Sequence, residues 1–509
     1  MKRALLSVWD KTHIVELAKF LVENKIEIIS TGGTKKILLE NGIEVTSISD
    51  ITEFNEVMNG RVKTLHPKIF GGILADKKNK NHLNDLKNIN GKTIDIVVVN
   101  LYPFEKMALE DSITFNELIE YIDVGGPSML RAAAKNYNSV VTLCDPKMYQ
   151  DFIINFSNSN GEINLEQRKL YASKVFLETT KYDSVIYNKF LEQELVSSLP
   201  NSLNINLNKS FDLRYGENPH QEASYYTDKT SSCWEQLSGK KLSYNNFFDM
   251  ESAISIIREF EEPCCSIIKH SNPCGFSIGK NLSECFERAV SCDPISYFGG
   301  IVGFNKKIDS KIAKKLIEPF LECIVCPDVD DEALDILKMK KNLRVIKYNE
   351  KFNFSNSSIR SVMGGVLMQT LSEKTVEKNN WNVVTDSRPN KEHIKAMEIG
   401  WKLVKYVKSN AIVIANENQI LGVGAGQMSR VDSVKIAIRK SKENDLNLVY
   451  SIMASDAFFR FSDSLEIASK EGIEGIIQPG GSIKDKEVID FANENNLFMV
   501  FTGERHFLH

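Results

Sequence analysis

The sequence predicts an α/β protein whose first part is built on a parallel sheet, and two observations carry this prediction. Short apolar segments alternate with stretches of helical periodicity over residues 1–145, which is typical of a parallel sheet with helices packed on it. The alternation resumes beyond residue 200, after a polar and mostly helical stretch. We therefore expect one domain at 1–145, a helical extension and connector at 146–200, and a second α/β region at 201–509.

Within the first part, apolar segments predict the strands and periodic segments predict the helices. Buried strands are expected at 5–8, 26–29, 94–100 and 139–143. An amphipathic helix is expected at 14–24. A second helix follows the segment at 30–34 and ends near Asn41-Gly42, a pair that favours a helix C-terminus.

Beyond residue 200, the same criteria predict further α/β units but show no fixed-period repeat. Strands are expected at 265–268, 301–304, 324–326, 411–415, 420–423, 473–477 and 497–501. Helices are expected at 282–290, 391–406, 433–440 and 486–493. Any internal duplication is too diverged to be visible in this sequence alone.

The composition is that of an ordinary soluble protein: of the 509 residues, 42% are hydrophobic and 26% are charged. The formal net charge of -4 argues against a nucleic-acid binder held by bulk charge, although it leaves room for local basic pockets. No stretch approaches the roughly 18 apolar residues of a membrane span. Asp10-Lys11 ends the first apolar run too early for a signal peptide. We therefore expect a cytoplasmic protein that binds neither nucleic acid nor membrane.

Nine cysteines are present, and their odd number, without an export signal, argues for free thiols rather than disulfides. Cys323 and Cys326 have a spacing that metal and redox sites use, but no second pair accompanies them. Because they lie in an apolar segment, we expect two buried thiols there and no metal site.

Two loops of the first part have the composition of an anion site. One joins a strand to a helix and consists of Ser30, Thr31, Gly32, Gly33 and Thr34. Its glycines let the backbone approach a phosphate, and the helix start offers free N–H groups. The other loop supplies Arg61, Lys63 and Thr64, and Ser7 and Lys11 at the end of the first strand can join the same site. Taken alone, each loop also fits an ordinary turn or a solvated basic loop.

A Gly-Gly-Pro turn precedes a short helix predicted at 128–135. Asp123 stands before the turn and Lys135 ends the helix. A carboxylate and an ammonium brought together in this way can act as a proton-transfer pair. A surface salt bridge is the commoner alternative.

The segment KHSNPCG at 269–275 places a Lys and a His side by side, after an apolar run and before an Asn-Pro turn. Neighbouring side chains on a strand point to opposite faces. If Lys269 and His270 serve one substrate, the strand must already have ended. The alternative is a histidine with a structural role only.

Eleven motifs occur in order along the chain: STGGTKK, GRVKTLHP, VVVNLYPF, DVGGPSMLRAAAKN, LRYGENPHQ, LSYNN, KHSNPCG, GAGQMSRVDS, SDAFF, QPGGSIKD and RHFLH. Together they resemble the bifunctional purine-biosynthesis enzymes that act as aminoimidazolecarboxamide ribonucleotide (AICAR) transformylase and IMP cyclohydrolase. The resemblance covers essentially all 509 residues, and eleven ordered motifs make chance agreement negligible.

The resemblance implies a methylglyoxal-synthase-like N-terminal domain and a C-terminal region of two cytidine-deaminase-like lobes. It also implies a homodimer whose transformylase site is built across the subunit interface. The second region would transfer a formyl group from 10-formyltetrahydrofolate to the 5-amino group of AICAR, which gives FAICAR. The first domain would close FAICAR to IMP with loss of water. Neither step needs a metal or a tightly bound cofactor.

Lys269 and His270 fit the transformylase reaction that the resemblance implies. The aromatic 5-amine is a poor nucleophile, and its attack on the formyl carbon makes an N–H acidic and places charge on the formyl oxygen. His270 is suited to take the proton at neutral pH, and Lys269 can stabilise the oxyanion. Pro273 can hold the turn by restricting Asn272.

The other site residues follow from the family's motifs. For the ribonucleotide of the transformylase, the resemblance implies Arg214, Tyr215, Gly299, Glu322, Asn410 and Arg430. For the folate it implies Phe458, Asp463, Ser482, Ile483 and Arg505, and His509 matches a C-terminal His near the reacting centre. For the cyclohydrolase it implies catalytic roles for Lys63, Tyr102, Asp123 and Lys135, with Ser30–Thr34 and Arg61–Thr64 contacting the phosphate and the base.

The chain departs from the family's usual pattern at five positions, none of which carries a catalytic role assigned above. Trp9 replaces a small residue, His13 a small or polar one, Phe70 a His, Tyr297 a small residue and Arg460 a Pro. The first three lie in the cyclohydrolase domain, where they can reshape the rim of the pocket.

Two other functions compete with this interpretation. A zinc nucleoside deaminase would share the fold of the second region, but it needs H-x-E and P-C-x-x-C motifs. Here Ser271-Asn272 follows His270, and no second Cys completes the motif after Pro273-Cys274. A non-catalytic nucleotide sensor would explain the anion loops but would give Lys269 and His270 no function.

Overall fold

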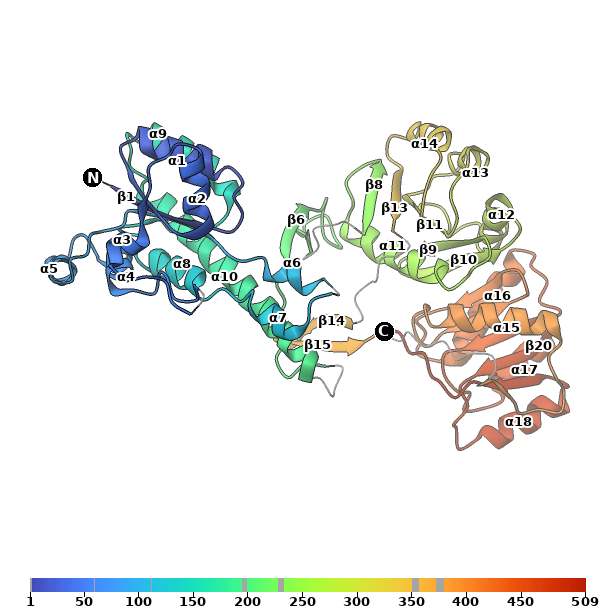
Figure 1. Cartoon of the computed structure of the whole chain (residues 1–509). Coiled ribbons are helices and arrows are strands. Elements are labelled where there is room, and N and C mark those ends of the chain that lie inside the picture. The colour runs from blue at the N-terminus through green and yellow to red at the C-terminus, as the bar shows by residue number, and fades with distance from the viewer. Residues whose placement is uncertain are drawn as a thin grey trace. The chain divides into compact units, whose positions relative to one another are not determined.

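The computed structural model describes residues 2–58, 60–110, 112–194, 199–227, 233–349, 357–371 and 380–509. The chain divides into two compact units, Met1–Asn206 and Leu207–His509 (Figure 1). The polar helical stretch expected at 146–200 therefore lies inside the first unit. Among the described residues, no helix is long and apolar enough to cross a membrane.

The first unit contains one five-stranded sheet, ordered β3-β2-β1-β4-β5, in which every neighbouring pair is parallel. The strands are β1 (Arg3–Val8), β2 (Glu27–Ser30), β3 (Thr46–Ser47), β4 (Ile96–Asn100) and β5 (Val141–Leu143). Strand β4 is buried along its whole length, because helices cover both faces of a parallel sheet. The predicted parallel sheet is confirmed.

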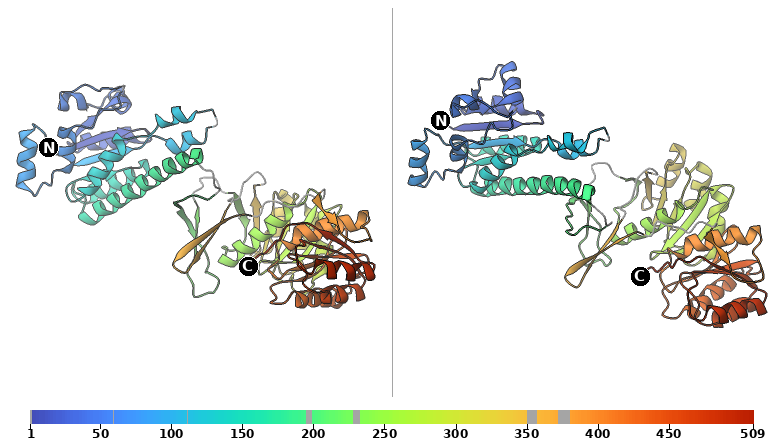
Figure 2. Two further views of the ribbon diagram at one scale, coloured as in Figure 1. Left: turned by 90° about the horizontal axis from the view of Figure 1, so that it is seen from below. Right: turned by 60° about the horizontal axis from the view of Figure 1, so that its bottom comes forward.

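The helices of this unit lie in the connections between the strands, except η1, α9 and α10, which follow the last strand, β5. They are α1 (Ile14–Glu23), α2 (Gly32–Glu40), α3 (Ile48–Thr52), α4 (Pro67–Leu74), α5 (Lys80–Asn88), α6 (Phe104–Ala108), α7 (Phe115–Ile119), α8 (Gly125–Lys135), the 3-10 helix η1 (Pro146–Met148), α9 (Tyr149–Asn158) and α10 (Leu165–Glu194). Helix α10 has 30 residues, packs against α8 and β5, and runs along the unit in all three views (Figure 1; Figure 2). Helix α8 begins three residues before its predicted start, because Pro127 is tolerated in a first turn whose N–H groups need no helical partner.

The second unit contains two six-stranded sheets of the same topology. Their orders are β10-β9-β11-β12-β13-β8 and β18-β17-β19-β20-β21-β16. In each sheet the third, fourth and fifth strands of this order are parallel to one another, and the remaining pairs are antiparallel. The duplication that the resemblance implies is confirmed at the level of topology.

The two lobes also follow the same element order. The first lobe consists of β8 (Trp234–Ser238), α11 (Tyr244–Ile257), β9 (Cys264–Lys269), β10 (Asn272–Ile278), α12 (Leu282–Cys292), β11 (Ile301–Phe304), α13 (Ser310–Leu316), β12 (Cys323–Cys326), α14 (Asp331–Lys338) and β13 (Arg344–Tyr348). The second lobe consists of β16 (Asn382–Val383), α15 (Lys391–Val404), β17 (Ile412–Ala415), β18 (Ile420–Gly424), α16 (Arg430–Glu443), β19 (Ser451–Ser455), α17 (Asp463–Lys470), β20 (Ile473–Gln478), α18 (Asp485–Glu494) and β21 (Phe498–Phe501).

Three apolar clusters hold the lobes. One is shared, since it combines residues of α11 and α15 with residues from both sheets, and it includes the fully buried Trp401. The other two clusters belong to one lobe each, under α12–α14 and under α16–α18. The shared cluster makes the two lobes one folded unit.

Two hairpins lie outside both sheets: β6 (Asn208–Asp212) with β7 (Ser224–Thr227), and β14 (Ser357–Val362) with β15 (Gly365–Thr370).

Two strands that matter for the site were not predicted. Strand β10 contains Pro273 and Gly275, which sequence rules assign to a turn, but Pro is tolerated there because β10 is an edge strand. Strand β19 is fully buried, yet Ser451 and Ser455 interrupt the apolar run that would have marked it.

Two candidate active sites

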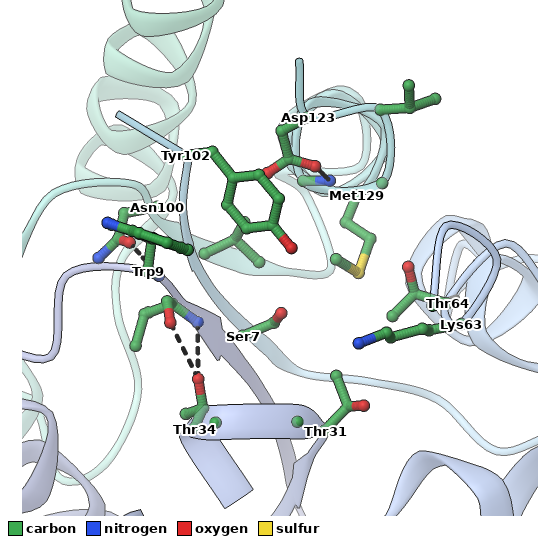
Figure 3. Close-up of a pocket in the computed structure, with 18 of the residues that line it drawn as sticks. Ser7, Trp9, Thr31, Thr34, Lys63, Thr64, Asn100, Tyr102, Asp123 and Met129 are labelled. Carbon is green, nitrogen blue, oxygen red and sulfur yellow. Dashed lines mark hydrogen bonds between the residues drawn. The ribbon is translucent and has the colours of Figure 1, made fainter. Parts of the chain in front are cut away.

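The first unit has a cavity of about 590 Å³ at the carboxyl ends of β1, β2 and β4, where α/β sheets bind ligands. Figure 3 shows the side chains of Ser7, Lys63 and Tyr102 pointing toward the middle of this cavity from separate parts of the chain. Most residues predicted for the cyclohydrolase line it: Ser7, Lys11, Thr31, Gly32, Gly33, Thr34, Arg61, Lys63, Thr64, Tyr102 and Asp123.

The start of α2 forms the anion-binding end of the cavity. Thr31 is the N-cap residue, and the N–H groups of the first turn lie at the cavity, where they suit an anion. Gly32 has a φ of 54°, a value that favours glycine, and a Cβ there would lie 3.8 Å from Lys63 Nζ. Lys63 therefore approaches the helix start, and it also pairs with Glu56 at 3.1 Å.

Lys11 supplies a second ammonium at the same end. Its Nζ donates to the Val8 carbonyl and, at 2.9 Å, to the Trp9 carbonyl. Burial lowers the pKa of Lys11 below its usual range. On the loop that also carries Lys63, Arg61 lines the cavity and pairs with Glu120. Cationic side chains from two segments of the chain therefore line the cavity, which suits a phosphate.

Asp123 is the less exposed of two carboxyl groups that line the cavity, the other being Glu120. Burial raises the pKa of Asp123 above its usual range, although hydrogen bonds from the backbone oppose the shift. The Gly126 N–H donates to Asp123 Oδ1 at 2.8 Å, and a Cβ on Gly126 would lie only 2.3 Å from Asp123 Oδ2. The Asp123 N–H in turn donates to Tyr182 Oη at 2.7 Å. A fixed carboxyl group that is easily protonated is suited to proton transfer.

Two residues predicted for this site do not line the cavity. Ser30 is fully buried, and its Oγ donates to the Leu6 carbonyl at 2.7 Å, which is a structural role between strands. Lys135 is exposed on the last turn of α8, whose 11 residues span about 16 Å. The predicted pairing of Asp123 with Lys135 is therefore wrong, because the helix separates the two residues instead of joining them.

Asn100 also lines the cavity and was not predicted, whereas Trp9 lies at the cavity as expected from the sequence. Asn100, the last residue of β4, accepts the N–H groups of Trp9 at 2.6 Å and Asp10 at 2.9 Å, so it fixes the loop after β1. The Trp9 ring packs edge-on against Tyr102, with 5.0 Å between ring centroids. A polar residue that ends the most apolar strand was the available signal for Asn100.

In the second unit, Lys269 and His270 lie at the β9–β10 hairpin. Lys269 ends β9, and His270 and Ser271 form the turn, with φ values of 53° and 60°. Two residues of positive φ are typical of a tight hairpin turn. The expected Asn-Pro turn is therefore wrong, because Asn272 pairs with Lys269 as the first residue of β10. The Ser271 N–H donates to Asp249 Oδ1 at 2.6 Å, which holds the turn against α11.

Gly299 and Glu322 lie near Lys269, at the end of the sheet where β9 finishes. Strand β9 is antiparallel to β11, so the end of β9 lies beside the segment that leads into β11. Lys269 Nζ donates to the Phe298 carbonyl at 2.8 Å, and a Cβ on Gly299 would lie 3.3 Å from that Nζ. Glu322 precedes β12 and pairs with Arg344 at 2.7 Å.

Asn410 and Arg430 form a polar cluster in the second lobe. Arg430 Nη2 donates to Asn410 Oδ1 at 3.0 Å and to Asp456 Oδ1 at 2.7 Å. Asp456 is fully buried, and Ser409 Oγ donates to its other oxygen at 2.5 Å. Sequence reasoning missed Asp456, although it stands in the SDAFF motif.

Hydrogen bonds connect this cluster with the hairpin and with the end of the chain. The Lys408 N–H donates to Asn272 Oδ1 at 3.0 Å, immediately beside the His270 turn. The Ser409 N–H donates to the Leu508 carbonyl at 2.9 Å, and the Leu508 N–H donates to Ser409 Oγ at 3.2 Å. The two lobes and the C-terminal residues thus meet in one region.

The residues predicted for the folate follow the carboxyl ends of three adjacent parallel strands. Phe458 and Asp463 come after β19, Ser482 and Ile483 after β20, and Arg505 after β21. Arg430 Nη1 donates a hydrogen bond to the Phe458 carbonyl at 3.3 Å. This bond connects the strand ends to the polar cluster of Asn410 and Arg430. The carboxyl ends of parallel strands are where α/β sheets bind ligands.

Arg214 and Tyr215 lie between β6 and β7. The Arg214 guanidinium lies 5.2 Å from the centre of the Tyr215 ring. The Tyr215 carbonyl accepts the Tyr244 N–H at 3.2 Å, at the start of α11. Their predicted contact with the ribonucleotide stays a prediction.

Cys323 and Cys326 are buried in β12, as predicted, and burial raises the pKa of both thiols. Within the described part of the chain, no group of three or more His, Cys, Asp or Glu side chains is arranged to hold a metal ion.

Comparison with known proteins gives two matching family models. The model described as "AICARFT/IMPCHase bienzyme" matches residues 133–440, and that described as "MGS-like domain" matches residues 13–128. Two similar proteins are each described as "Bifunctional purine biosynthesis protein PurH". The one from Bacillus cereus (strain B4264) is 47% identical and the one from Caldicellulosiruptor saccharolyticus is 48% identical, and each match covers 100% of both chains. A solved structure described as "Crystal structure of ForH" is 33% identical, covers 37% of this chain and 98% of its own, and has a TM-score of 0.34.

Proposed function

Since this chain belongs to the AICARFT/IMPCHase bienzyme family, we propose that its two folded units divide the family's two reactions between them. The chain is a bifunctional enzyme of purine biosynthesis, an AICAR formyltransferase and IMP cyclohydrolase. We assign the cyclohydrolase to residues 1–145 and the formyltransferase to residues 201–509. Residues 146–200 serve as a helical extension and connector.

The formyltransferase takes AICAR and uses 10-formyltetrahydrofolate as a co-substrate rather than as a tightly bound cofactor. The cyclohydrolase takes FAICAR and releases IMP and water. Each nucleotide carries a phosphate and a planar ring, so each site needs an anion-binding end and groups that orient the ring. The enzyme acts in the cytoplasm as a homodimer, without a metal and without nucleic acid.

The anion-binding end of the first cavity is suited to the phosphate of FAICAR. The N–H groups at the start of α2 and the Lys11 ammonium face this end, and both favour a dianion. The ring then reaches toward Tyr102 and Asp123 at the other end. Lys63 lines the same cavity beside the start of α2, and we assign its ammonium to the formyl oxygen.

Ring closure needs two protons moved from nitrogen to oxygen, one from the carboxamide and one from the formamide. The carboxamide nitrogen attacks the formyl carbon, and negative charge develops on the formyl oxygen, where Lys63 stabilises it. Asp123, whose pKa burial raises, takes a proton from the attacking nitrogen and delivers it to the formyl oxygen, which becomes a hydroxyl. The proton of the formamide nitrogen then moves to this hydroxyl as the C=N bond of the new ring forms. One water leaves, and the purine ring is complete.

Formyl transfer needs a base and an oxyanion donor beside the 5-amine of AICAR. The amine attacks the formyl carbon of the folate, and His270 takes the N–H proton. Lys269, held at the Phe298 carbonyl, stabilises the oxyanion with its remaining N–H groups. The tetrahedral intermediate then collapses with cleavage of the bond to the folate N10, which takes up a proton, so tetrahydrofolate and FAICAR result.

The nucleotide and folate contacts of the formyltransferase are distributed over both lobes. We assign the ribonucleotide to Arg214, Tyr215, Gly299, Glu322, Asn410 and Arg430. We assign the folate to Phe458, Asp463, Ser482, Ile483 and Arg505. The hydrogen bond between Lys408 and Asn272 supports a single site, because it ties the His270 turn to the segment that carries Asn410.

The observation that carries this assignment is the gathering of the predicted anion loops, Tyr102 and Asp123 around one cavity. The test is to incubate the purified chain with AICAR and 10-formyltetrahydrofolate and to follow IMP, with FAICAR alone as the assay for ring closure. IMP should form in both assays. Formation of FAICAR without IMP would refute the cyclohydrolase assignment.

A further inference from the structure

An ion pair between Lys440 and Asp293 joins the two lobes of the second unit beside the formyl-transfer residues. Lys440 lies on α16 of the second lobe, and Asp293 directly follows α12 of the first lobe. The Asp293 side chain is 8% exposed and that of Lys440 is 35% exposed. Solvent screens a partly buried ion pair less than an exposed one. This pair can therefore fix the position of α16 relative to the end of α12.

Asp293 organises the segment at 293–300. Its Oδ1 accepts the Ser296 N–H at 2.9 Å, and its backbone carbonyl accepts the Tyr297 N–H at 3.2 Å. Lys440 Nζ also donates to Ser296 Oγ at 3.3 Å. Burial acts to raise the pKa of Asp293, but hydrogen bonds from Lys440 and Ser296 outweigh it and lower that pKa, so the carboxylate stays charged.

The same segment carries the group that holds the Lys269 ammonium. The Phe298 carbonyl accepts Lys269 Nζ at 2.8 Å. The next residue, Gly299, has a φ of 66°, and its N–H donates to the Phe320 carbonyl at 2.8 Å. The position of the ammonium therefore depends on a short backbone segment, and Asp293 holds the beginning of that segment.

A cavity of about 330 Å³ connects these groups. Lys269 and His270 line it together with Asp293, Ser296 and Lys440. Helix α16 thus reaches the site at two points. It begins with Arg430, which binds Asn410, and it presents Lys440 to Asp293 further along.

We propose that Lys440 and Asp293 are positioning residues for formyl transfer: through the segment at 293–300 they fix the Phe298 carbonyl and, with it, the ammonium of Lys269. The inference rests on the role of Lys269 in the proposed function. The competing explanation is that the pair only stabilises the contact between the lobes.

The decisive variant is Lys440→Met. A misplacement of the ammonium by about 1 Å should lower the kcat of formyl transfer by roughly 10- to 100-fold. The KM for AICAR should change by less than about threefold, since the pair makes no contact with the nucleotide in this account. Ring closure of FAICAR by the same preparation should be unchanged. Lys440→Arg, which keeps the charge, should restore kcat to within about threefold of the parent.

Asp293→Asn is the second variant, because it keeps an acceptor for the Ser296 N–H but removes the charge. It should show the same loss of kcat, and it decides the question if Lys440→Met does not fold. Lys435→Met is the matched control on α16, since Lys435 is 60% exposed and pairs only within its own helix, with Asp432. The control should keep the parent kcat.

Three results would overturn the proposal. These are a parent-like kcat in Asp293→Asn, an equal loss of kcat in the control, and an Arg variant as impaired as the Met variant. His270→Ala separates this inference from the function beneath it. If that variant still transfers formyl groups, the proposed function fails; if it is inactive while Asp293→Asn is parent-like, only the positioning role fails.

Discussion

Trp9 shows how one residue can shape the cavity that we assign to the cyclohydrolase. Its side chain is 48% exposed, lines the cavity and packs edge-on against Tyr102. The hydrogen bond from its N–H to Asn100 fixes the backbone beneath it. The family resemblance implies a small residue at this position, so the indole adds an aromatic wall to the cavity.

Trp9→Ser should weaken nucleotide binding to this cavity. Stacking of a base on an aromatic ring contributes about 1–3 kcal/mol, so the KM for FAICAR should rise by roughly tenfold or more, whereas Trp9→Phe should stay close to the parent. The measurement is the kinetics of ring closure, together with quenching of tryptophan fluorescence by IMP. An unchanged KM in the Ser variant would show that the indole does not contact the base.

Asp123 couples activity to stability. Asp123→Asn should lower the kcat of ring closure by about 10²–10⁴-fold, because an amide cannot take the proton. Formyl transfer should be unchanged.

The same variant should be more stable than the parent at neutral pH. Burial raises the pKa of Asp123 above its ordinary value of 3.8, so the protonated form stabilises the fold at low pH. That contribution is lost as the pH rises through the raised value. The Asn variant does not ionise, so its unfolding midpoint should exceed that of the parent by a margin that grows as the pH rises from about 4 through the raised pKa of Asp123. A margin that shrinks as the pH rises would contradict the burial of this carboxyl group.

At the scale of residues, the sequence predicted side chains with an evident chemistry, such as Lys63, Tyr102 and Asp123, and the structure brings these three to one cavity. It did not predict Asn100 or Asp456, because their importance comes from backbone groups and side chains that only the folded chain brings to them. The pairing with Lys135 failed because sequence proximity was taken for contact across a helix.

At the scale of elements, the approach of β9 to the segment before β11 sets the position of Lys269. Gly299→Ala should therefore impair formyl transfer. A Cβ there would lie 3.2 Å from a Phe320 ring carbon and 3.3 Å from Lys269 Nζ, at a φ of 66°. Displacement of the ammonium should lower kcat by roughly 10- to 100-fold.

Gly364→Ala is the matched control for this variant. Gly364 has a φ of 77°, and nothing lies within 4 Å of an added Cβ. The control carries the same backbone strain in the β14–β15 turn without contact with the site, so it should keep the parent kcat. Equal losses in the two variants would show that strain, and not contact with Lys269, causes the effect.

The elements that could be predicted are buried strands with an unbroken run of apolar residues, such as β4 and β11. Strand β10 could not be predicted, because the tolerance of an edge strand for Pro273 depends on its place in the sheet. The His270–Ser271 turn was missed for the same reason, since its residues gain their conformation from the hairpin that they close.

At the scale of the whole molecule, the proposed function assigns each reaction to one folded unit. The parallel sheet of the first unit follows from alternating strands and helices, and it was predicted. The duplication in the second unit appears in the strand order of the two sheets. It is not visible in the amino-acid sequences of the two lobes, because one topology accepts many sequences of the same apolar pattern.

The most direct test of the division between the units is to mix two single variants. His270→Ala should form no FAICAR but should close added FAICAR to IMP, and Asp123→Asn should form FAICAR but close it slowly. Mixed in one reaction with AICAR and 10-formyltetrahydrofolate, the two should restore IMP formation, because FAICAR made by one enzyme diffuses to the other. If His270→Ala alone makes IMP from AICAR, or if the mixture makes no more IMP than Asp123→Asn alone, the assignment of one reaction to each unit is contradicted.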